Sequence, residues 1–404
     1  YIKSAREYGI SIDSDISINF TEIISRSRSV AETMSKGVNF LLKKNKIDVL
    51  KGRGRINDIG VVEVENENGK NVFYAKNIII ATGSHSRELP DIKIDGTKII
   101  GYKQALSLNR LPQSMIVVGS GAIGVELAKF YGTLGTRITL VEYMPNILPI
   151  ADEDVSKYME RTLKKANIEL HTSSQVINVE KQNDSKCKVV IKTATQEIIK
   201  ESEIVLLSVG ITPNTDDIGI EEVGITTKNG YIIVDEYFKT NKEGIYAIGD
   251  VIPTPALAHV ASAEAITCVE KIAGLNPKPL NYNTVPSCIF TSPEIASVGL
   301  TEKQAAEKGI TTKIGRFPYT ASGKAISSGH KDGFVKLIFN SVDSKLIGAH
   351  MIGANVTELI SELALAINKN STAHDIIKTI HPHPTMSEAI MEAAAQAYGE
   401  AIHV

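Results

Sequence analysis

One histidine near the C-terminus has the surroundings of an acid/base group. His383 lies between Pro382 and Pro384, which restrict its backbone, and Glu388 follows in the first turn of a helix-forming segment. A carboxylate that binds an imidazole can orient the ring and stabilise its protonated form. Thr385 and Glu388 also fit a capping box, in which the carboxylate only satisfies a helix end. The spacing leaves both roles open for Glu388.

A glycine-rich segment indicates that the chain binds a dinucleotide. Gly119, Gly121 and Gly124 have the G-x-G-x-x-G spacing, directly after the apolar run 115–118. In such a turn the glycines allow a tight bend, an approach of backbone amides to a pyrophosphate and close helix-to-strand packing. Glu142 ends the next apolar run, where a carboxylate can bind a ribose 2′-hydroxyl. Residues 143–145 include no arginine for a 2′-phosphate, so the pattern favours NAD over NADP.

Three further apolar runs indicate a second nucleotide-binding unit. Run 78–84 ends in Ala-Thr-Gly-Ser, run 204–210 ends in Gly210, and run 245–248 delivers Asp250 to the carboxyl end of a strand. Open α/β sheets bind their ligands at this edge. An N-cap or turn aspartate explains Asp250 equally well when it is taken alone. The order of the runs predicts two interleaved units rather than two consecutive ones.

Hydrophobic spacing predicts the elements that must position these residues. After residue 283 the pattern changes to strands followed by helices, which predicts a separate α+β domain. A long amphipathic helix is predicted to start at 19–22 and to run to 42, and two shorter helices are predicted at 123–134 and 152–165. In the C-terminal domain Asn355 is expected to cap a further helix. The other predicted strands are 47–50, 61–65, 71–74, 137–142, 169–172 and a meander at 175–180, 188–193 and 197–200.

Length and composition fit a globular protein of two or three domains. The chain has 404 residues, of which 43% are hydrophobic, and a net charge of −2 with acids and bases interspersed. This balance favours neither a nucleic-acid partner nor an anionic membrane, and there is no run of about 18 apolar residues that could span a bilayer. Cys187, Cys268 and Cys288 lie far apart and match no metal or redox spacing, so we expect reduced thiols and no bound metal.

Taken together, these segments resemble the pyridine nucleotide-disulfide oxidoreductases over essentially the whole chain. Within that family the chain is most similar to the flavoproteins that oxidise dihydrolipoamide with NAD in 2-oxo acid dehydrogenase complexes. The resemblance implies an α/β fold with two interleaved Rossmann-like domains for FAD and NAD, and a C-terminal α+β dimerisation domain. The implied division is 1–100 for FAD, 101–223 for NAD, 224–282 for the rest of the FAD-binding and central part, and 283–404 for dimerisation.

The resemblance also implies roles for individual residues. His383 matches the family's catalytic base and Glu388 its supporting glutamate, in a homodimer where the base serves the disulfide and flavin of the other subunit. The residues matched to FAD contacts are Gly54, Thr82, Gly83, Ser84, Asp250, Ala256, Leu257, Ala258 and His259. The residues matched to NAD contacts are Gly119, Ser120, Gly121, Ala122, Ile123, Gly124, Val125, Glu126, Glu142, Val176 and Gly210.

The sequence departs from the family pattern at two places. The family's own FAD fingerprint and its Cys-x-x-x-x-Cys redox pair do not occur, and the resemblance begins just downstream of them, so we expect an N-terminally truncated copy. Ile211 and Thr212 stand where many relatives have an arginine. Two alternatives therefore stay open: a catalytically incompetent remnant that binds nucleotides and dimerises, or another NAD(P)H-disulfide reductase.

The resemblance finally implies the surroundings of the protein. We expect a cytoplasmic homodimer, or one in the mitochondrial matrix, that acts on dihydrolipoamide carried by a lipoyl domain. Neither a nucleic acid nor a membrane is expected among its partners.

Overall fold

A five-stranded parallel sheet carries the glycine-rich segment in the computed structural model, which describes residues 2–12, 16–182 and 186–403. Its strands β7 and β13 are buried along almost their whole length, as is usual for a parallel sheet covered on both faces. The strand order is β6 (Ile99–Ile100), β13 (Ile204–Leu207), β7 (Ser114–Val118), β8 (Arg137–Val141) and β9 (Glu169–His171). Helices α2 (Tyr102–Ala105), α3 (Ala122–Thr133) and α4 (Glu153–Lys165) connect these strands. An antiparallel meander of β10 (Gln175–Lys181), β11 (Cys187–Lys192) and β12 (Glu197–Ser202) precedes β13, as predicted.

The second nucleotide-type unit is built from segments on either side of this sheet in the sequence. Strand β4 (Ile78–Ile80) pairs in parallel with β17 (Ile245–Ala247), so the prediction of interleaved units is confirmed. Strands β5 (Ser84–Ser86) and β14 (Ile211–Pro213) form an antiparallel connection between the two units. The remaining elements are β1 (Arg53–Asp58), β2 (Val61–Asn66), β3 (Gly69–Tyr74), α5 (Ile220–Val223), β15 (Thr227–Lys228), β16 (Tyr231–Ile232), the 3₁₀ turn η2 (Gly249–Val251) and α6 (Ala258–Ile272).

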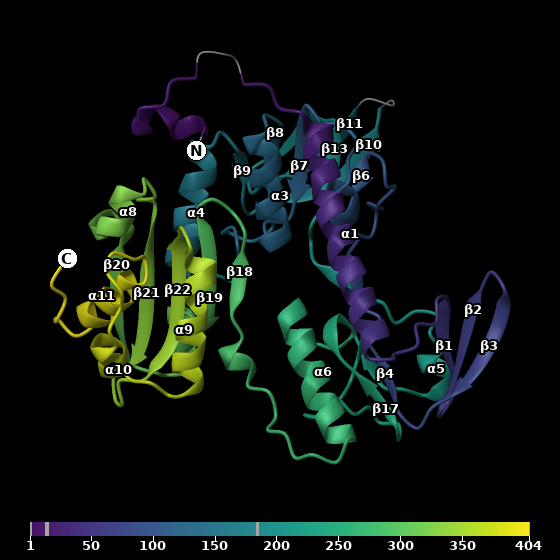
Figure 1. Ribbon diagram of the computed structural model, residues 1–404. Coiled ribbons are helices and arrows are strands. Elements are labelled where there is room, and N and C mark those ends of the chain that lie inside the picture. The colour runs from purple at the N-terminus through teal and green to yellow at the C-terminus, as the bar shows by residue number, and fades with distance from the viewer. Residues whose placement is uncertain (1, 13–15, 183–185, 404) are drawn as a thin grey trace.

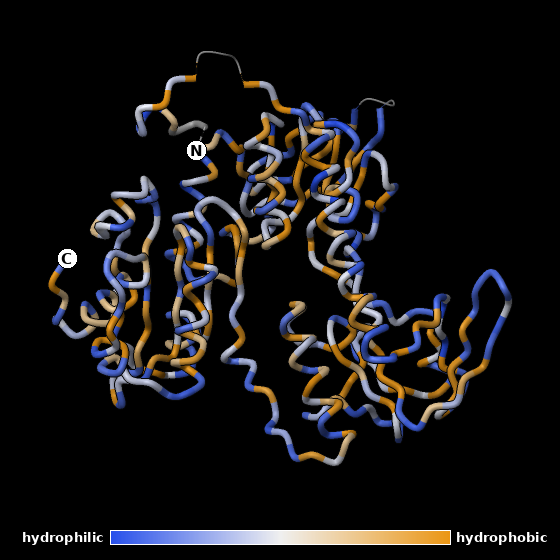
Figure 2. The backbone as a smooth tube through the Cα atoms, in the orientation of Figure 1, coloured by the Kyte–Doolittle hydropathy of each residue, from blue (hydrophilic) through white to orange (hydrophobic). Residues whose placement is uncertain are grey.

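A separate antiparallel sheet forms the C-terminal part, at the left of Figure 1. Its strand order is β18 (Ser287–Ile289), β19 (Glu294–Gly299), β22 (Leu346–Gly353), β21 (Gly333–Asn340) and β20 (Thr312–Pro318). Apolar segments run along these strands (Figure 2), and α9 (Val356–Asn368) and α11 (Glu388–Gln396) share one core with them. The shorter elements are η3 (Tyr282–Thr284), α7 (Glu302–Glu307), η4 (Tyr319–Ala321), α8 (Gly323–Ser327) and α10 (Ala373–Lys378). The predicted α+β arrangement is confirmed.

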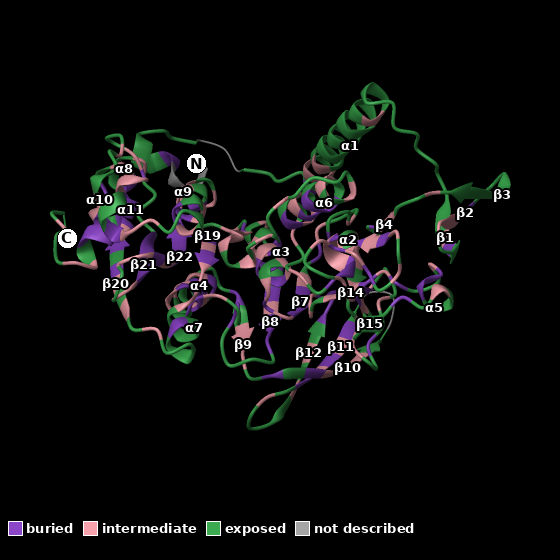
Figure 3. Cartoon of the chain, turned by 90° about the horizontal axis from the view of Figure 1, so that it is seen from below, coloured by how far each residue is buried: buried purple, intermediate pink, exposed green. Residues whose placement is uncertain are grey.

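The long N-terminal helix forms as predicted, but its apolar residues are not buried. After η1 (Ile2–Tyr8), α1 (Phe20–Lys44) starts at Asn19, whose side chain accepts a hydrogen bond from Glu22 N. Phe20 is its one buried residue among those described, and Met34 and Phe40 are 67% and 65% exposed. Figure 3 shows the helix exposed along most of its length. Amphipathic spacing therefore predicted the helix correctly without predicting what covers its apolar side.

Three details of the predicted elements are wrong. Residues 47–50 form no strand, because no neighbouring strand pairs with them and Ile47, Val49 and Leu50 are all exposed. The predicted strand 78–84 is divided into the short β4 and β5. Asn355 precedes α9 with a left-handed backbone, and its side chain makes no capping hydrogen bond.

None of the helices in the described ranges combines the length and the apolar character needed to cross a membrane.

The contact of α11 with β20 depends on a glycine, which gives a first test of the fold. A Cβ atom on Gly315 would lie 1.7 Å from the carbonyl oxygen of Ala393, so we expect Gly315→Ala to push α11 away from the sheet. Overpacking of this kind costs about 1–3 kcal/mol, measured as the free energy of unfolding in urea. Gly323→Ala is the matched control, since a Cβ atom there meets no atom within 4 Å. Equal stability of the two variants would contradict the tight contact.

Candidate active site

The glycine-rich turn between β7 and α3 has the geometry of a pyrophosphate cradle. Gly119 has a φ of 97°, and a Cβ atom there would lie 2.5 Å from the carbonyl oxygen of Ser208. A Cβ atom on Gly124 would lie 2.0 Å from the carbonyl oxygen of Gly119, so α3 packs directly on the end of β7. A Cβ atom on Gly121 would meet nothing within 4 Å. Space for a ligand therefore exists at the glycine where backbone amides would approach a phosphate.

Glu142, at the end of β8, binds this turn directly. Its Oε2 accepts hydrogen bonds from Ser120 N at 2.8 Å and Ser120 Oγ at 2.6 Å, and its Oε1 accepts one from Met144 N at 2.8 Å. The sequence suggested only a contact to a ribose. The structure adds that Glu142 holds the glycine-rich turn in place, while Oε1 keeps capacity for a second hydrogen bond from a hydroxyl.

The first turn of α3 faces the C-terminal part across a cavity of about 490 Å³. Gly121, Ala122, Val285 and Ser287 are among its lining residues. Glu126 links α3 to the C-terminal part, because its Oε1 accepts a hydrogen bond from Phe290 N at 2.8 Å. Burial raises the pKa of Glu126 although that hydrogen bond opposes the shift.

Some residues that sequence matching grouped with this site do not direct a side chain into it. Val125 and Val176 are 0% and 3% exposed and belong to the hydrophobic core, so their side chains are not available to a ligand. Gly210 follows β13 with a φ of 114°. A Cβ atom at that glycine would lie 3.7 Å from the guanidinium carbon of Arg87, and Arg87 N donates a hydrogen bond to Gly210 O at 3.0 Å. The guanidinium of Arg87 thus lies beside Gly210, next to Ile211 and Thr212, where many relatives have an arginine in the sequence.

A second group of polar residues lies where β4 and β17 end. Ser84 Oγ donates a hydrogen bond to Asp250 Oδ2 at 2.7 Å. Within the described ranges the other oxygen of Asp250 has no partner, which leaves it available to a ligand hydroxyl. Gly83 has a φ of 72° and open space beside it. This arrangement fits the polyhydroxyl chain of a flavin nucleotide.

The other residues matched to FAD contacts differ in how near they lie to Ser84 and Asp250. Thr82 Oγ1 donates to Asn214 O at 2.6 Å, which ties the site to β14. Ala256, Ala258 and His259 are exposed around the start of α6 and Leu257 is half-buried. His259 Nε2 lies 2.9 Å from Pro286 O. Gly54 is instead part of β1, where it pairs with Val64 in a different sheet.

His383 and Glu388 form the predicted contact, whereas the predicted capping box does not form, because α11 starts at Glu388 with Ser387 as its N-cap. His383 Nδ1 lies 2.8 Å from Glu388 Oε1, while Glu388 Oε2 accepts a hydrogen bond from Thr385 N at 2.8 Å. Burial alone would raise the pKa of Glu388, but these two hydrogen bonds lower it. The imidazole is 79% exposed. Its Nε2 has no partner among the described residues, so this nitrogen is free to take a proton.

His381 is a neighbouring residue that the sequence did not single out. Its Nδ1 lies 2.9 Å from Thr379 O and its Nε2 lies 3.0 Å from Glu362 Oε1. Both partners accept hydrogen bonds, so this arrangement favours the doubly protonated, cationic form of His381. The hydrogen bond to Glu362 raises the pKa of His381. The signal that could have revealed it is the H-x-H spacing, whereas its partner Glu362 lies on α9, with α10 between them in the chain.

No cluster of three or more metal-binding side chains occurs within the ranges that the structure describes. Cys187, Cys268 and Cys288 are free thiols, and the first two are buried. Burial raises the pKa of all three, that of Cys268 to about 11. None of these cysteines is therefore an activated thiolate or one half of a redox pair.

Comparison with known proteins identifies the class that these two sites define. Residues 6–265 match the family of pyridine nucleotide-disulphide oxidoreductases, and residues 285–394 match the dimerisation domain of the same family. The chain belongs to this family. It is 43% identical to the dihydrolipoyl dehydrogenase of Bacillus subtilis, in a match that covers 99% of this chain and 86% of that protein. Dihydrolipoyl dehydrogenase of Rhizobium etli is 40% identical, with 98% and 86% covered.

Solved structures agree with this assignment. LpdA from Mycobacterium tuberculosis superposes with a TM-score of 0.90 and 27% identity, over 97% of this chain and 85% of that chain. The flavoprotein disulfide reductase RclA from Escherichia coli shares the fold, with a TM-score of 0.81 and 22% identity over 94% and 86% of the two chains. The α/β arrangement expected from the sequence is confirmed.

The His381–Glu362 pair predicts a pH-dependent contribution to stability. Because the folded pKa of His381 is raised above its ordinary value of 6.5, the contribution is complete below that value and is lost as the pH rises through the folded pKa. We expect Glu362→Gln to lower the free energy of unfolding at about pH 6 and to have little effect at about pH 9. The exposed Glu358 on the same helix provides the control variant Glu358→Gln. A loss that is equal at both pH values would disprove the cationic state of His381.

Proposed function

We propose that the chain performs the nucleotide-binding and acid/base steps of a flavoprotein that oxidises dihydrolipoamide with NAD, as part of a 2-oxo acid dehydrogenase complex. The observation that carries the proposal is the His383–Glu388 pair, in which one ring nitrogen is held and the other is free. The similarity to proteins named dihydrolipoyl dehydrogenase extends over nearly the whole chain and supports the same substrate. We assign the parts 1–100 and 224–282 to FAD, 101–223 to NAD and 283–404 to dimerisation.

His383 is the proposed base in the dithiol step. A thiol of dihydrolipoamide would give its proton to Nε2 of His383 as its sulfur attacks a protein disulfide. The protein S–S bond breaks, one protein sulfur leaves as a thiolate that is then protonated, and a mixed disulfide forms. Glu388 accepts the Nδ1–H hydrogen bond and so stabilises the imidazolium. The second thiol then attacks the mixed disulfide, which releases the oxidised cyclic product and leaves a protein dithiol. A bound flavin supplies the route by which the two electrons of this dithiol reach NAD.

The cofactor positions follow from the same geometry. The NAD pyrophosphate would bind at Gly121 and the start of α3, with Glu142 on the ribose. The flavin nucleotide would bind beside Ser84 and Asp250, whose carboxylate would accept a hydrogen bond from a hydroxyl. The dimerisation match at 285–394 supports a homodimer in which the C-terminal sheet packs on its partner. A location in the cytoplasm or in the mitochondrial matrix fits three reduced cysteines, and a relative from Arabidopsis thaliana is named as mitochondrial.

A direct assay tests the proposal. The three cysteines of this chain cannot supply the disulfide, since each is a free thiol. We therefore expect reduction of NAD by dihydrolipoamide only when the chain is joined to a segment that carries a close-spaced cysteine pair. The same observation favours a second candidate, a nucleotide-binding and dimer-forming remnant. That candidate is correct if the joined protein binds FAD and NADH but shows no turnover.

The nucleotide site predicts a preference for NADH over NADPH. Glu142 would accept a hydrogen bond from the ribose hydroxyl and would repel a phosphate at that position. Loss of a charge-assisted hydrogen bond weakens binding by roughly 10- to 100-fold, so Glu142→Ala should raise the dissociation constant for NADH by this factor. Fluorescence titration measures it, with the exposed Glu180→Ala as control. Equal affinity of the unmodified protein for both nucleotides would disprove the assignment.

Replacement of the proposed base His383 should cause a large and selective loss of turnover. We expect His383→Gln in the joined protein to lower the rate with dihydrolipoamide by about 10²–10⁴, the usual contribution of a general base. FAD binding and dimer formation should persist, because the ring is 79% exposed. His403→Gln is the matched control, since His403 forms a similar pair with Glu392 at 2.6 Å. An equal loss in both variants would show a structural role instead.

The same variant tests the dimer. A subunit with His383→Gln, mixed with a subunit that lacks the cysteine pair, should restore one working site in each heterodimer. Heterodimers without activity would show that the base does not act across the interface.

A further inference from the structure

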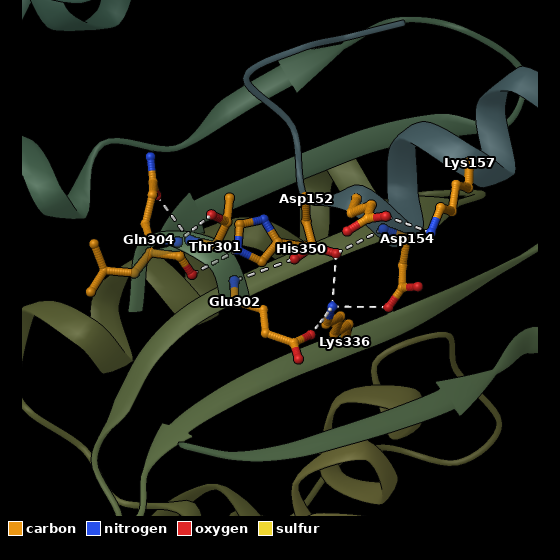
Figure 4. Close-up of polar contacts among 10 residues, drawn as sticks. Asp152, Asp154, Lys157, Thr301, Glu302, Gln304, Lys336 and His350 are labelled. Atoms are coloured by element: carbon orange, nitrogen blue, oxygen red, sulfur yellow. Dashed lines mark hydrogen bonds and ion pairs between the residues drawn. The ribbon is translucent and has the colours of Figure 1, made fainter. Parts of the chain in front are cut away.

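Lys336 is a buried lysine whose ammonium group binds three carboxylates (Figure 4). Its side chain is 2% exposed, and Nζ lies 2.9 Å from oxygens of Asp152, Asp154 and Glu302. An ammonium group has three N–H donors, so all of them are used. Burial alone would lower the pKa of Lys336, but the hydrogen bonds to the three carboxylates raise it. Lys336 is therefore a fixed positive charge.

Other basic groups act on the cluster more weakly than Lys336. Arg316 on β20 is the cross-strand neighbour of Lys336, and both Arg316 and Lys157 lower the pKa of Asp154, but less than Lys336 does. His350 pairs with Lys336 across β21 and β22, and burial lowers the pKa of His350, which favours its neutral form. Three carboxylates therefore depend mainly on one ammonium group, and removal of Lys336 would leave them mutually repelling and partly buried.

The cluster joins the two halves of the chain. Asp152 and Asp154 lie at the start of α4 in the nucleotide-type half, whereas Glu302 starts α7 and Lys336 lies on β21 in the C-terminal half. Asp152 also accepts hydrogen bonds from Asp154 N at 3.1 Å and from Glu302 N at 3.5 Å. The position of the start of α4 is thus set by the C-terminal sheet.

Residues 143–151 connect this cluster to the glycine-rich turn. On the side of the cluster, Ser156 Oγ of α4 donates a hydrogen bond to Ile147 O at 2.6 Å. On the other side, Leu148 N donates to Ser120 O at 3.1 Å and lies 3.3 Å from Ser120 Oγ. Leu148 has a φ of 49°, in the left-handed region, and is 2% exposed. A leucine keeps this conformation only where its surroundings hold it there.

The loop 143–151 has open space on two sides. Leu148, Ile150 and Ala151 line both the cavity of about 490 Å³ beside the glycine-rich turn and one of about 730 Å³ beside α7. Ile147 and Leu148 anchor the middle of the loop in the hydrophobic core, whereas Ile150 is 88% exposed. Beyond that anchor, polar contacts hold the loop at its two ends, Glu142 at Ser120 and Asp152 at Lys336.

We propose that Lys336 is a positioning residue for the pyridine nucleotide site, which holds loop 143–151 through Asp152 and so keeps Ser120 and the glycine-rich turn in their binding arrangement. The inference rests on the proposed NAD site and goes beyond it, because it makes the affinity of that site depend on a residue of the C-terminal sheet.

The experiment compares NADH binding and loop exchange in matched variants of the full chain. Lys336→Met removes the charge, and Lys345→Met is the control, since Lys345 pairs with Asp343 at the surface. We expect Lys336→Met to raise the dissociation constant for NADH about tenfold in fluorescence titrations, as for loss of a hydrogen-bonded restraint. Hydrogen–deuterium exchange of residues 143–151 should become faster in Lys336→Met and stay unchanged in Lys345→Met. If Lys336→Met fails to fold, Glu302→Gln removes one of the three carboxylates and should show the same effects, less strongly.

The outcomes separate this inference from the proposed function. If the unmodified chain does not bind NADH, the nucleotide site is wrong and loop exchange alone decides the role of Lys336. If a folded variant keeps the affinity and loop exchange of the unmodified chain, the inference is wrong. A loss of thermal stability without either change would show that the cluster only joins the two halves.

Discussion

The contact between the start of α3 and the end of β7 is the constraint on which the nucleotide-type half depends. Any side chain at Gly124 would collide with the carbonyl oxygen of Gly119, so the helix can start only where its backbone touches the strand. Ser208 Oγ, directly after β13, lies 2.9 Å from both Val118 O and Gly119 O and shares its one hydrogen between them, which fixes the same point. Because parallel strands end at one edge, this contact places the first amides of α3 where β8 delivers Glu142.

The chain crosses between its two nucleotide-type units at paired strands. Strand β4 pairs with β17, although the segments that form the parallel sheet lie between them in the chain. Strand β5 then pairs with β14. Asn214 Nδ2 donates a hydrogen bond to Thr82 O at 2.9 Å, so the strand endings of the two units are linked. The positions of Thr82 and Asp250 are thus fixed relative to β14 and, through it, to the parallel sheet.

Several carboxylates in this protein perform two tasks, because each has two oxygens with separate partners. Glu142 uses one oxygen for Ser120 and the other for Met144 N. Glu388 satisfies Thr385 N with one oxygen and orients His383 with the other. Asp152 starts α4 and also binds Lys336. In each case a hydrogen bond from the backbone fixes the carboxylate, which then holds a functional or structural partner in a defined place. In Asp152 the oxygen Oδ1 binds both Asp154 N and Lys336 Nζ, and Oδ2 accepts from Glu302 N.

The sequence by itself determined the elements and the positions of the chemical groups. Spacing at period 3.6 or in short apolar runs predicts α3, β7 and β8, since these patterns reflect local burial, and the glycine spacing predicts the turn between them. Only the tertiary structure decided which distant groups meet. Lys336 lies far from Asp152 in sequence, Arg87 reaches Gly210 from another strand, and His381 gains its charge from Glu362 on a separate helix. Residues 47–50 show the opposite case, because an apolar run becomes a strand only when a neighbour offers hydrogen bonds. Contacts of this kind depend on how the elements pack, and no local pattern contains that information.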